Sequence, residues 1–214
     1  MENYKQEFIK FSLNQGVLKF GEFELKSGRI SPYFFNMGLF NTGSTIAKLG
    51  DFYAQALVNK EKNFDLLFGP AYKGIPIVTA LASSLSTSYQ LDKPFVYNRK
   101  EIKNHGEGGV TVGEELGGNV VVVDDVITAG TAIREAVDII NNAGATTAGI
   151  VISLDRQEKG IGNLSAAEEI SNALNIPVIS IANLDEVIDY IENNSSDYGQ
   201  HMDQIKKYRE EYGV

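Results

Sequence analysis

The alternation of apolar runs with helix-like stretches constrains the fold of this chain more than any other feature. From Ser44 onward, five short apolar runs have the character of buried strands, at residues 64–68, 94–97, 120–123, 149–154 and 177–181. Between these runs, apolar residues recur at helical spacing, as at Ile133, Ala136, Val137 and Ile140. Apolar strands separated by amphipathic helices are typical of a parallel sheet covered on both faces. We therefore predict an α/β fold with a central, mostly parallel sheet flanked by helices.

The two ends of the chain carry further predictions. Residues 2–16 have the pattern of a helix, and residues 17–40 form short β-like runs separated by glycines. We expect the second segment to be a small hairpin or hood appended to the main sheet. The tail from Asp197 is predicted to be helical. No repeat, low-complexity tract or linker divides the sequence, so we expect a single domain over residues 1–214.

One long segment interrupts the alternation. Residues 99–118 are polar and rich in glycine. A loop of this length inside a compact domain is usually functional or disordered. We expect a long flexible lid loop here, because Gly106, Gly108 and Gly109 allow hinge motion.

The charge balance narrows the classes of ligand. The chain carries a formal net charge of −9, and a strongly acidic protein is a poor general binder of nucleic acid. It can still bind a small anion through a local cluster of Lys and Arg. There is no cysteine, which excludes disulfides and thiolate chemistry. No segment has the pattern of a signal peptide or of a membrane span, so we expect a cytoplasmic protein with no nucleic-acid or membrane partner.

Residues 120–131 carry the strongest chemical signal. An apolar strand ends in Asp124 and Asp125, and a turn of small residues, Thr128 to Thr131, opens directly into a helix. The backbone N–H groups of such a turn, the helix N-terminus and the threonine hydroxyls together make a seat for a phosphate monoester. The acids would repel phosphate, so we assign them to sugar hydroxyls or to a divalent cation. These features together indicate a ribose 5-phosphate.

Two other interpretations of this segment remain. An acidic strand end of a nucleotide hydrolase would require a G-x-x-x-x-G-K-[ST] partner, and the sequence contains none. The segment could also be a helix cap with solvated aspartates.

Two more predicted strands end in charged or glycine-rich turns. The turn from Gly69 to Gly74 carries Lys73, and Asp155 and Arg156 follow the run 149–154. Singly, each basic residue is more often a solvated surface charge. The carboxyl ends of parallel strands meet at one edge of a sheet, where open α/β sheets bind their ligands. We therefore expect these residues to share one site with the two acids.

Cations gather in the predicted lid. Arg99, Lys100, Lys103 and His105 lie within seven residues of an acidic chain. The alternative is a solvated charge run. A mobile cationic lid suits a pyrophosphate leaving group, because its closure excludes water from an oxocarbenium-like transition state and strengthens charge pairing inside.

Aromatic residues in the hood admit two interpretations. Phe34 and Phe35 follow Lys26 and Arg29 in the segment expected to form the hood. The two rings would suit a flat apolar plate for a heteroaromatic base, or they belong to the core.

These segments together resemble a known family. Residues 120–131 are similar to the phosphoribosyl-pyrophosphate motif of type I phosphoribosyltransferases. Within that class, the chain resembles the orotate phosphoribosyltransferases at Leu25-Lys-Ser-Gly-Arg, Ser31-Pro-Tyr-Phe-Phe-Asn, Phe68-Gly-Pro-Ala-Tyr-Lys-Gly-Ile-Pro, Asn98-Arg-Lys-Glu, His105-Gly-Glu-Gly-Gly and Ser153-Leu-Asp-Arg-Gln-Glu. The resemblance runs nearly end to end, without a departure at a motif position, and implies the type I phosphoribosyltransferase fold.

The resemblance also implies roles for individual residues. The catalytic residues would be Asp124, Asp125, Lys103, Lys73 and Lys26. Phosphoribosyl pyrophosphate would be bound by Lys26, Tyr72, Lys73, Arg99, Lys100, Lys103, His105, Asp124, Asp125, Val126, Ile127, Thr128, Ala129, Gly130, Thr131 and Ala132. Orotate would be bound by Lys26, Phe34, Phe35, Thr128 and Arg156.

The implied reaction transfers the ribose 5-phosphate group from 5-phosphoribosyl-1-pyrophosphate to N1 of orotate, in pyrimidine biosynthesis. The resemblance implies Mg²⁺ held mainly by substrate oxygens rather than by protein ligands, and a homodimer whose lid reaches the neighbouring site. Two alternatives stay open. A phosphoribosyltransferase for a purine or another pyrimidine would lack a partner such as Arg156 for the orotate carboxylate. A regulatory protein would keep the fold to sense nucleotides, but the acidic charge and the cationic lid count against it.

Overall fold

A computed structural model of the chain describes residues 1–25, 28–60, 63–103, 109–160, 162–194 and 198–214. Its main sheet has the strand order β5-β4-β3-β6-β7-β8 among these residues. The bounds are β3 (Leu66–Gly69), β4 (Phe95–Lys103), β5 (Gly109–Gly113), β6 (Asn119–Val123), β7 (Thr146–Asp155) and β8 (Val178–Asn183). Along this order, the neighbouring strands β4, β3, β6, β7 and β8 all pair in parallel, and β5 is antiparallel to β4. The predicted mostly parallel α/β sheet is confirmed.

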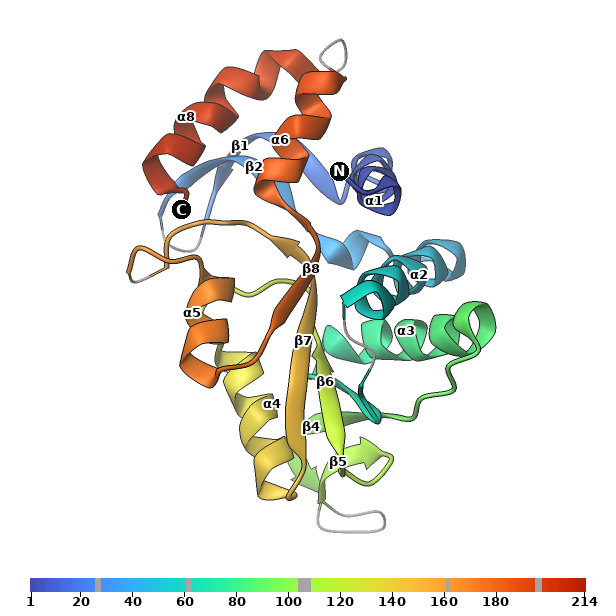
Figure 1. The fold of residues 1–214 in the computed structure, drawn as a ribbon. Helices are drawn as coiled ribbons and strands as arrows, with labels where there is room; N and C mark the ends of the chain where they lie inside the picture. The colour runs from blue at the N-terminus through green and yellow to red at the C-terminus, as the bar shows by residue number, and fades with distance from the viewer. Residues whose placement is uncertain (26–27, 61–62, 104–108, 161, 195–197) are drawn as a thin grey trace.

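Helices cover both faces of this sheet (Figure 1). One face carries α2 (Gly43–Lys60) and α3 (Gly74–Tyr89), and the other carries α4 (Thr131–Asn142) and α5 (Ala166–Leu174). The side chains of β6 alternate between the two faces, as the strand period requires. Val121 and Val123 join the core under α2 and α3, whereas Val120 and Val122 join the core under α4 and α5. Burial on both faces explains why these strands are almost purely apolar.

The hood lies beyond the carboxyl ends of the parallel strands (Figure 1). It contains the antiparallel pair β1 (Leu18–Glu24) and β2 (Ile30–Phe35), followed by the short helix η1 (Met37–Leu39). Around this pair lie α1 (Asn3–Asn14), α6 (Leu184–Asn193), η2 (Gly199–His201) and α8 (Met202–Tyr212). The hairpin expected within residues 17–40 and the helical tail are both present. No helix among the described residues is long and apolar enough to cross a membrane.

The prediction of a loop over residues 99–118 was wrong for residues 99–103 and 109–113, which form the two arms of a β-hairpin. Residues 99–103 continue β4, and β5 pairs with that strand from Val96↔Gly113 to Lys103↔Gly109. At Gly113, an added Cβ would lie 2.4 Å from the Phe95 carbonyl oxygen, so the close approach of the arms requires glycine. Polar residues misled the sequence interpretation because an edge strand open to solvent need not be apolar. Residues 104–108, which join the arms, lie outside the described residues.

Candidate active site

The acid pair lies directly after β6, where the sequence placed it. Asp124 and Asp125 are each only 8% exposed. Oδ1 of Asp124 accepts a hydrogen bond from the Asp125 backbone N–H at 2.9 Å, and Oδ1 of Asp125 accepts one from the Val126 N–H at 2.8 Å. Local main-chain donors therefore fix both carboxylates relative to the end of the strand.

Two buried hydroxyls hold the main chain of this pair. The Tyr53 hydroxyl of α2 donates to the Asp124 carbonyl oxygen at 2.7 Å. Ser153 of β7 donates to the Asp125 carbonyl oxygen from its hydroxyl at 2.6 Å and from its N–H at 2.8 Å. Both residues have 0% exposure. Sequence reasoning missed both roles, although a serine inside the apolar run 149–154 was a visible signal.

Burial sets the protonation chemistry of Asp124. Desolvation is the largest influence, and the neighbouring Asp125 charge adds to it, so the pKa of Asp124 rises to about 7 from an ordinary value of 3.8. The backbone N–H of Asp125 and the cations Lys73 and Lys100 oppose this shift. Asp124 therefore changes charge near neutral pH.

The anion seat follows the acids, between β6 and α4. Thr128, Ala129 and Thr131 are exposed, while Ile127 anchors the turn in the core under α4. Gly130, the residue before α4, has φ +71° and lies against Ile170, where an added Cβ would lie 2.5 Å from Cδ1. The seat is thus an exposed turn at a helix N-terminus, the local geometry that binds phosphate groups. The sequence predicted a turn of small residues from Thr128 to Thr131 that opens into a helix, and the structure has this turn.

The second turn, after β3, lies against the acid pair. Nζ of Lys73 forms an ion pair with Oδ2 of Asp125 at 2.5 Å. Tyr72 is 72% exposed. The backbone N–H of Ala71 donates to Oδ1 of Asn98, a buried residue of β4, at 2.7 Å. Asn98 thereby ties the turn to β4, a role that sequence reasoning missed.

The cationic arm, residues 99–103, continues β4 beyond Asn98. Lys100 pairs with Glu135 of α4 at 3.2 Å, and both side chains are substantially exposed. Arg99 donates from Nη1 to the Gly109 and Thr111 carbonyl oxygens of β5, at 3.3 and 3.4 Å. The side chain of Lys103, and Lys26 and His105 altogether, lie outside the described residues, so their assignments stay predictions.

The residues predicted to meet the base form a second group, at the end of β7 and in the hood. The Arg156 guanidinium pairs with Glu158 at 2.6 Å and lies over the Tyr33 ring, 4.8 Å from its centroid. Phe34 is exposed and stacks with Phe23 at 5.4 Å, whereas the Phe35 ring lies 6.4 Å from Phe8 of α1.

The placement of Phe34 and Phe35 tests whether the two rings form one flat apolar surface for a heteroaromatic base. Consecutive residues of a strand point to opposite faces, and the contacts of Phe34 and Phe35 differ accordingly. The two rings therefore do not form one flat plate in this structure. Their assignment to the base site stays a prediction.

A cavity of about 430 Å³ lies in the hood, away from the acid pair. Arg29, Ser31, Tyr208 and Tyr212 are among the residues that line it, and neither Asp124 nor Asp125 does. We place the candidate site at the two turns rather than in this cavity, because the turns combine carboxylates, a paired lysine and an anion seat.

Comparison with known proteins identifies the class that this architecture belongs to. A family model for the phosphoribosyl transferase domain matches residues 40–177, which include all the main-sheet strands except β8. The chain is therefore a phosphoribosyltransferase by family. An orotate phosphoribosyltransferase of Yersinia pestis (strain Pestoides F) is 58% identical over 214 residues, covering 100% of this chain and 99% of that protein. Within its class, the chain belongs to the orotate phosphoribosyltransferase family.

Solved structures agree with this placement. The orotate phosphoribosyltransferase of Francisella tularensis superposes with a TM-score of 0.88 at 46% identity, covering 97% of this chain and 100% of that one. The orotate phosphoribosyltransferase of Aeropyrum pernix superposes with a TM-score of 0.67 at 26% identity, covering 86% and 98%. The fold is accordingly the type I phosphoribosyltransferase fold that the sequence predicted.

Proposed function

We propose that the chain transfers the ribose 5-phosphate group of 5-phosphoribosyl-1-pyrophosphate to N1 of orotate, giving orotidine 5′-monophosphate and pyrophosphate in pyrimidine (UMP) biosynthesis. One observation carries the proposal: a buried acid pair and an anion seat occupy the junction of β6 and α4 in a chain of this family. The acids suit the ribose hydroxyls, and the seat suits the 5-phosphate.

The reaction requires no nucleophile from the protein. N1 of orotate forms a bond to the anomeric carbon and loses its proton to the departing pyrophosphate or to solvent, the bond from that carbon to pyrophosphate breaks, and the configuration at the carbon inverts. The protein's task is to position the reactants and to stabilise charge on the leaving group. We assign the pyrophosphate to Tyr72, Lys73, Arg99, Lys100, Lys103 and His105, with Lys26 reaching the substrates from the hood.

The acid pair has a further consequence for the leaving group. Lys73 is more than half exposed, yet Asp125 holds its ammonium beside the seat. A lysine fixed at this point can meet the departing pyrophosphate without a large rearrangement, because the partner carboxylate belongs to the same site.

The donor atoms fit Mg²⁺ held mainly by substrate oxygens. Both Asp125 oxygens already accept hydrogen bonds, from Val126 and Lys73, and Oδ1 of Asp124 accepts one from Asp125. No group of three potential metal ligands occurs among the described residues. Mg²⁺ is commonly bound through one or two carboxylates together with substrate phosphates and water. When bound, the ion would offset negative charge on the pyrophosphate.

We propose a homodimer with a shared active site. The support is the arrangement of the hairpin: β5 is an edge strand of the described sheet, and the arm of β4 that pairs with it carries the predicted pyrophosphate ligands Arg99 and Lys100. A neighbouring copy offers a site for these residues to cover.

The decisive experiment follows orotate absorbance after addition of the pyrophosphate donor and Mg²⁺. Orotate absorbance should fall, and no pyrophosphate should be released when a purine base replaces orotate, because Arg156 is assigned to the orotate carboxylate. Arg156→Ala should raise the KM for orotate by roughly 10- to 150-fold, as expected for loss of a charge-assisted hydrogen bond. The KM for the donor should change little. Absence of orotate turnover by the wild-type protein would refute the proposed function, and an equal loss of affinity for the donor would refute the role of Arg156.

A further inference from the structure

Glu158 holds the guanidinium of Arg156 in a defined orientation. Its Oε1 atom accepts hydrogen bonds from Arg156 Nε at 3.0 Å and Nη2 at 2.6 Å. The same oxygen accepts a third hydrogen bond from the Tyr33 hydroxyl at 2.7 Å. The side chains of Arg156 and Glu158 are only 16% and 14% exposed, so solvent screens this ion pair weakly.

The choice of nitrogen atoms determines what Arg156 can still bind. A guanidinium presents one bidentate edge through Nε and Nη2 and another through Nη1 and Nη2. Glu158 occupies the first edge. Among the described residues, the second edge, which includes Nη1, remains available to bind another carboxylate. The Tyr33 ring, over which the guanidinium lies, restricts the remaining rotation.

Tyr33 is well suited to this task. It is 1% exposed and lies in β2 of the hood. Burial raises the pKa of the Tyr33 hydroxyl well above its ordinary value, so the group stays protonated and donates to Glu158.

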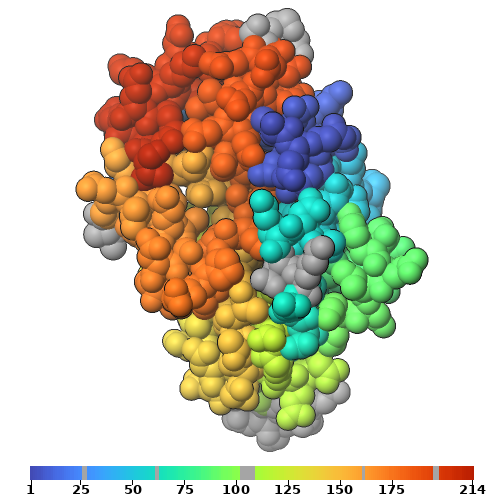
Figure 2. All heavy atoms as spheres, in the orientation of Figure 1, coloured from blue at the N-terminus to red at the C-terminus, as the bar shows by residue number. Residues whose placement is uncertain are grey.

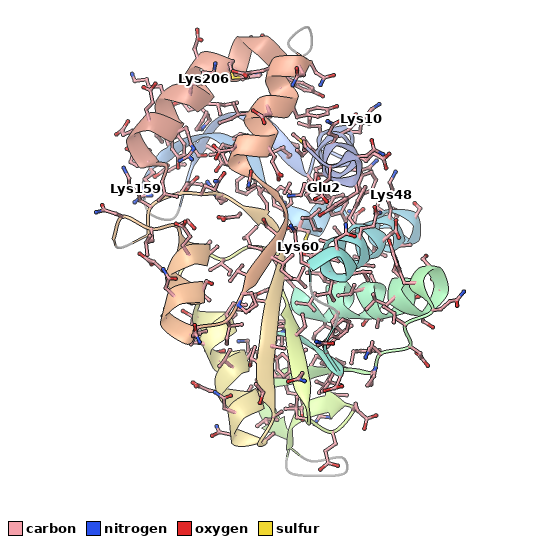
Figure 3. The ribbon with its side chains drawn as sticks, viewed as in Figure 1. Glu2, Lys10, Lys48, Lys60, Lys159 and Lys206 are labelled. Carbon is pink, nitrogen blue, oxygen red and sulfur yellow. The ribbon has the colours of Figure 1, made fainter. Side chains whose placement is uncertain are left out.

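The segment that carries Arg156 and Glu158 is itself fixed by distant parts of the chain. Gln157 lies between them with φ +48°, and its carbonyl oxygen accepts a hydrogen bond from the Val214 N–H at 3.0 Å. The Lys159 N–H donates to the Tyr212 carbonyl oxygen at 2.7 Å, and Glu158 forms a β-bridge with Gly213. Figure 2 shows the red atoms of α8 against the light-orange atoms of this segment, which Lys159 marks in Figure 3.

We propose that Glu158 is a positioning residue for base recognition: together with Tyr33 and the main chain of residues 212–214, it fixes Arg156 so that the Nη1/Nη2 edge meets the substrate carboxylate. This inference rests on the proposed function, because it takes the carboxylate to be that of orotate. It also gives α8 and the residues after it a part in base selection, although they lie far along the chain from the acid pair.

The test compares Glu158→Ala, Glu158→Gln and the control Glu210→Ala, which removes an exposed carboxylate of α8. Glu158→Ala should raise the KM for orotate on the order of tenfold and leave the KM for the donor unchanged. Glu158→Gln keeps an oxygen acceptor for Arg156 and Tyr33, so it should restore most of the loss. In the reverse reaction, the KM for orotidine 5′-monophosphate should rise while that for pyrophosphate stays constant. Glu210→Ala should match the wild-type protein in all four constants.

A double-mutant cycle separates positioning from a general structural role. In an Arg156→Ala background, Glu158→Ala should cause no further rise in the KM for orotate. An equal rise in both backgrounds would overturn the inference while leaving the proposed function intact. A fall in the KM for orotate in Glu158→Ala would also overturn it, since Glu158 would then be a competitor of the substrate carboxylate. If Glu158→Ala does not fold, Glu158→Gln carries the same cycle, with a rise of a few-fold expected. Wild-type protein that turns over no orotate would instead refute the function itself.

Discussion

The anion seat together with its acid pair, at residues 124–132, and the cationic arm at residues 99–103 are built in opposite ways. The seat is fixed by its main chain, with the Asp124 and Asp125 carbonyl oxygens held by hydroxyls from α2 and β7. The arm belongs to an edge hairpin, and its pair Lys100–Glu135 is exposed. A ligand that must be located to a fraction of an ångström needs the first kind of construction. A leaving group that must be bound and then released requires the second kind of construction, an exposed hairpin at the edge of the sheet.

The comparison extends to stability. Exposed ion pairs contribute about 0–1 kcal/mol, so side chains of the arm can be exchanged at little cost to folding. The acids of the seat are buried, and their charge is costly unless it is compensated. Function and stability should therefore separate differently in the two regions.

The largest effect is expected from Asp125→Asn in the seat. The asparagine keeps the shape and one oxygen but loses the charge that holds Lys73 and is assigned to the ribose hydroxyls. Turnover should fall on the order of a hundredfold. Thermal stability should change little, because Lys73 is mostly exposed and the ion pair lost is therefore weak.

The measurement pairs steady-state turnover with thermal unfolding of the same samples. Asp138→Asn, an exposed site on α4, is the matched control and should leave both values unchanged. A large drop in melting temperature with turnover per folded molecule preserved would assign the acid pair to structure and remove the distinction between the two regions.

Much of the seat could be predicted from sequence because its signals are local. The apolar run 120–123, the two acids and the small-residue turn are adjacent in the chain, and the strand–turn–helix context followed from periodicity. The carboxyl ends of parallel strands then placed Lys73 beside Asp125. The hydrogen bonds that hold this site come from residues far away in sequence, so Tyr53 and Asn98 gave no comparable signal, and Ser153 was visible only as a polar residue in an apolar run.

The arm and the hood were predicted less well for a related reason. Polarity suggested a loop over residues 99–118, whereas pairing with a partner strand makes its arms a hairpin. Adjacency suggested that Phe34 and Phe35 act together, whereas the strand period separates them. The pairing of Arg156 with Glu158 depends on Tyr33 and residues 212–214, which only the folded chain brings together.

A smaller effect is expected from Lys103→Ala in the arm. Charge develops on the leaving group during the reaction, so a lysine that meets it should act more strongly in the transition state than in the ground state. We expect kcat to fall about tenfold and the KM for the donor to rise less. Steady-state kinetics with varied donor at saturating orotate measures both constants. A rise in KM with an unchanged kcat would make Lys103 a binding residue only.

The proposed dimer makes this defect complementable. Mixing Lys103→Ala subunits with Asp125→Asn subunits should regenerate one intact site in each mixed dimer, if the arm and the seat come from different copies. Activity should then exceed the sum of the two parents. A mixture that never exceeds that sum, with subunit exchange verified, would show that the arm serves the seat of its own copy.

The smallest expected effect concerns stability and tests the burial of the seat directly. The pKa of Asp124 in the folded chain is about 7, against 3.8 ordinarily, with burial the largest cause. Between these two values the folded protein retains a proton that the unfolded chain has released, so the contribution of this group to stability is full below pH 4 and falls as the pH rises through about 7.

Asp124→Asn removes the charge at every pH. Without substrates, it should raise the melting temperature by roughly 2–6 °C at pH 8, by less than half of that at pH 5, and hardly at all below pH 4. Glu135→Gln, which breaks the exposed pair of the arm, should shift it by about a degree or less at both pH values. A melting temperature at pH 8 that falls in Asp124→Asn would mean that Lys73 and Lys100 stabilise the ionised carboxylate more than burial penalises it, and the seat would then resemble the arm.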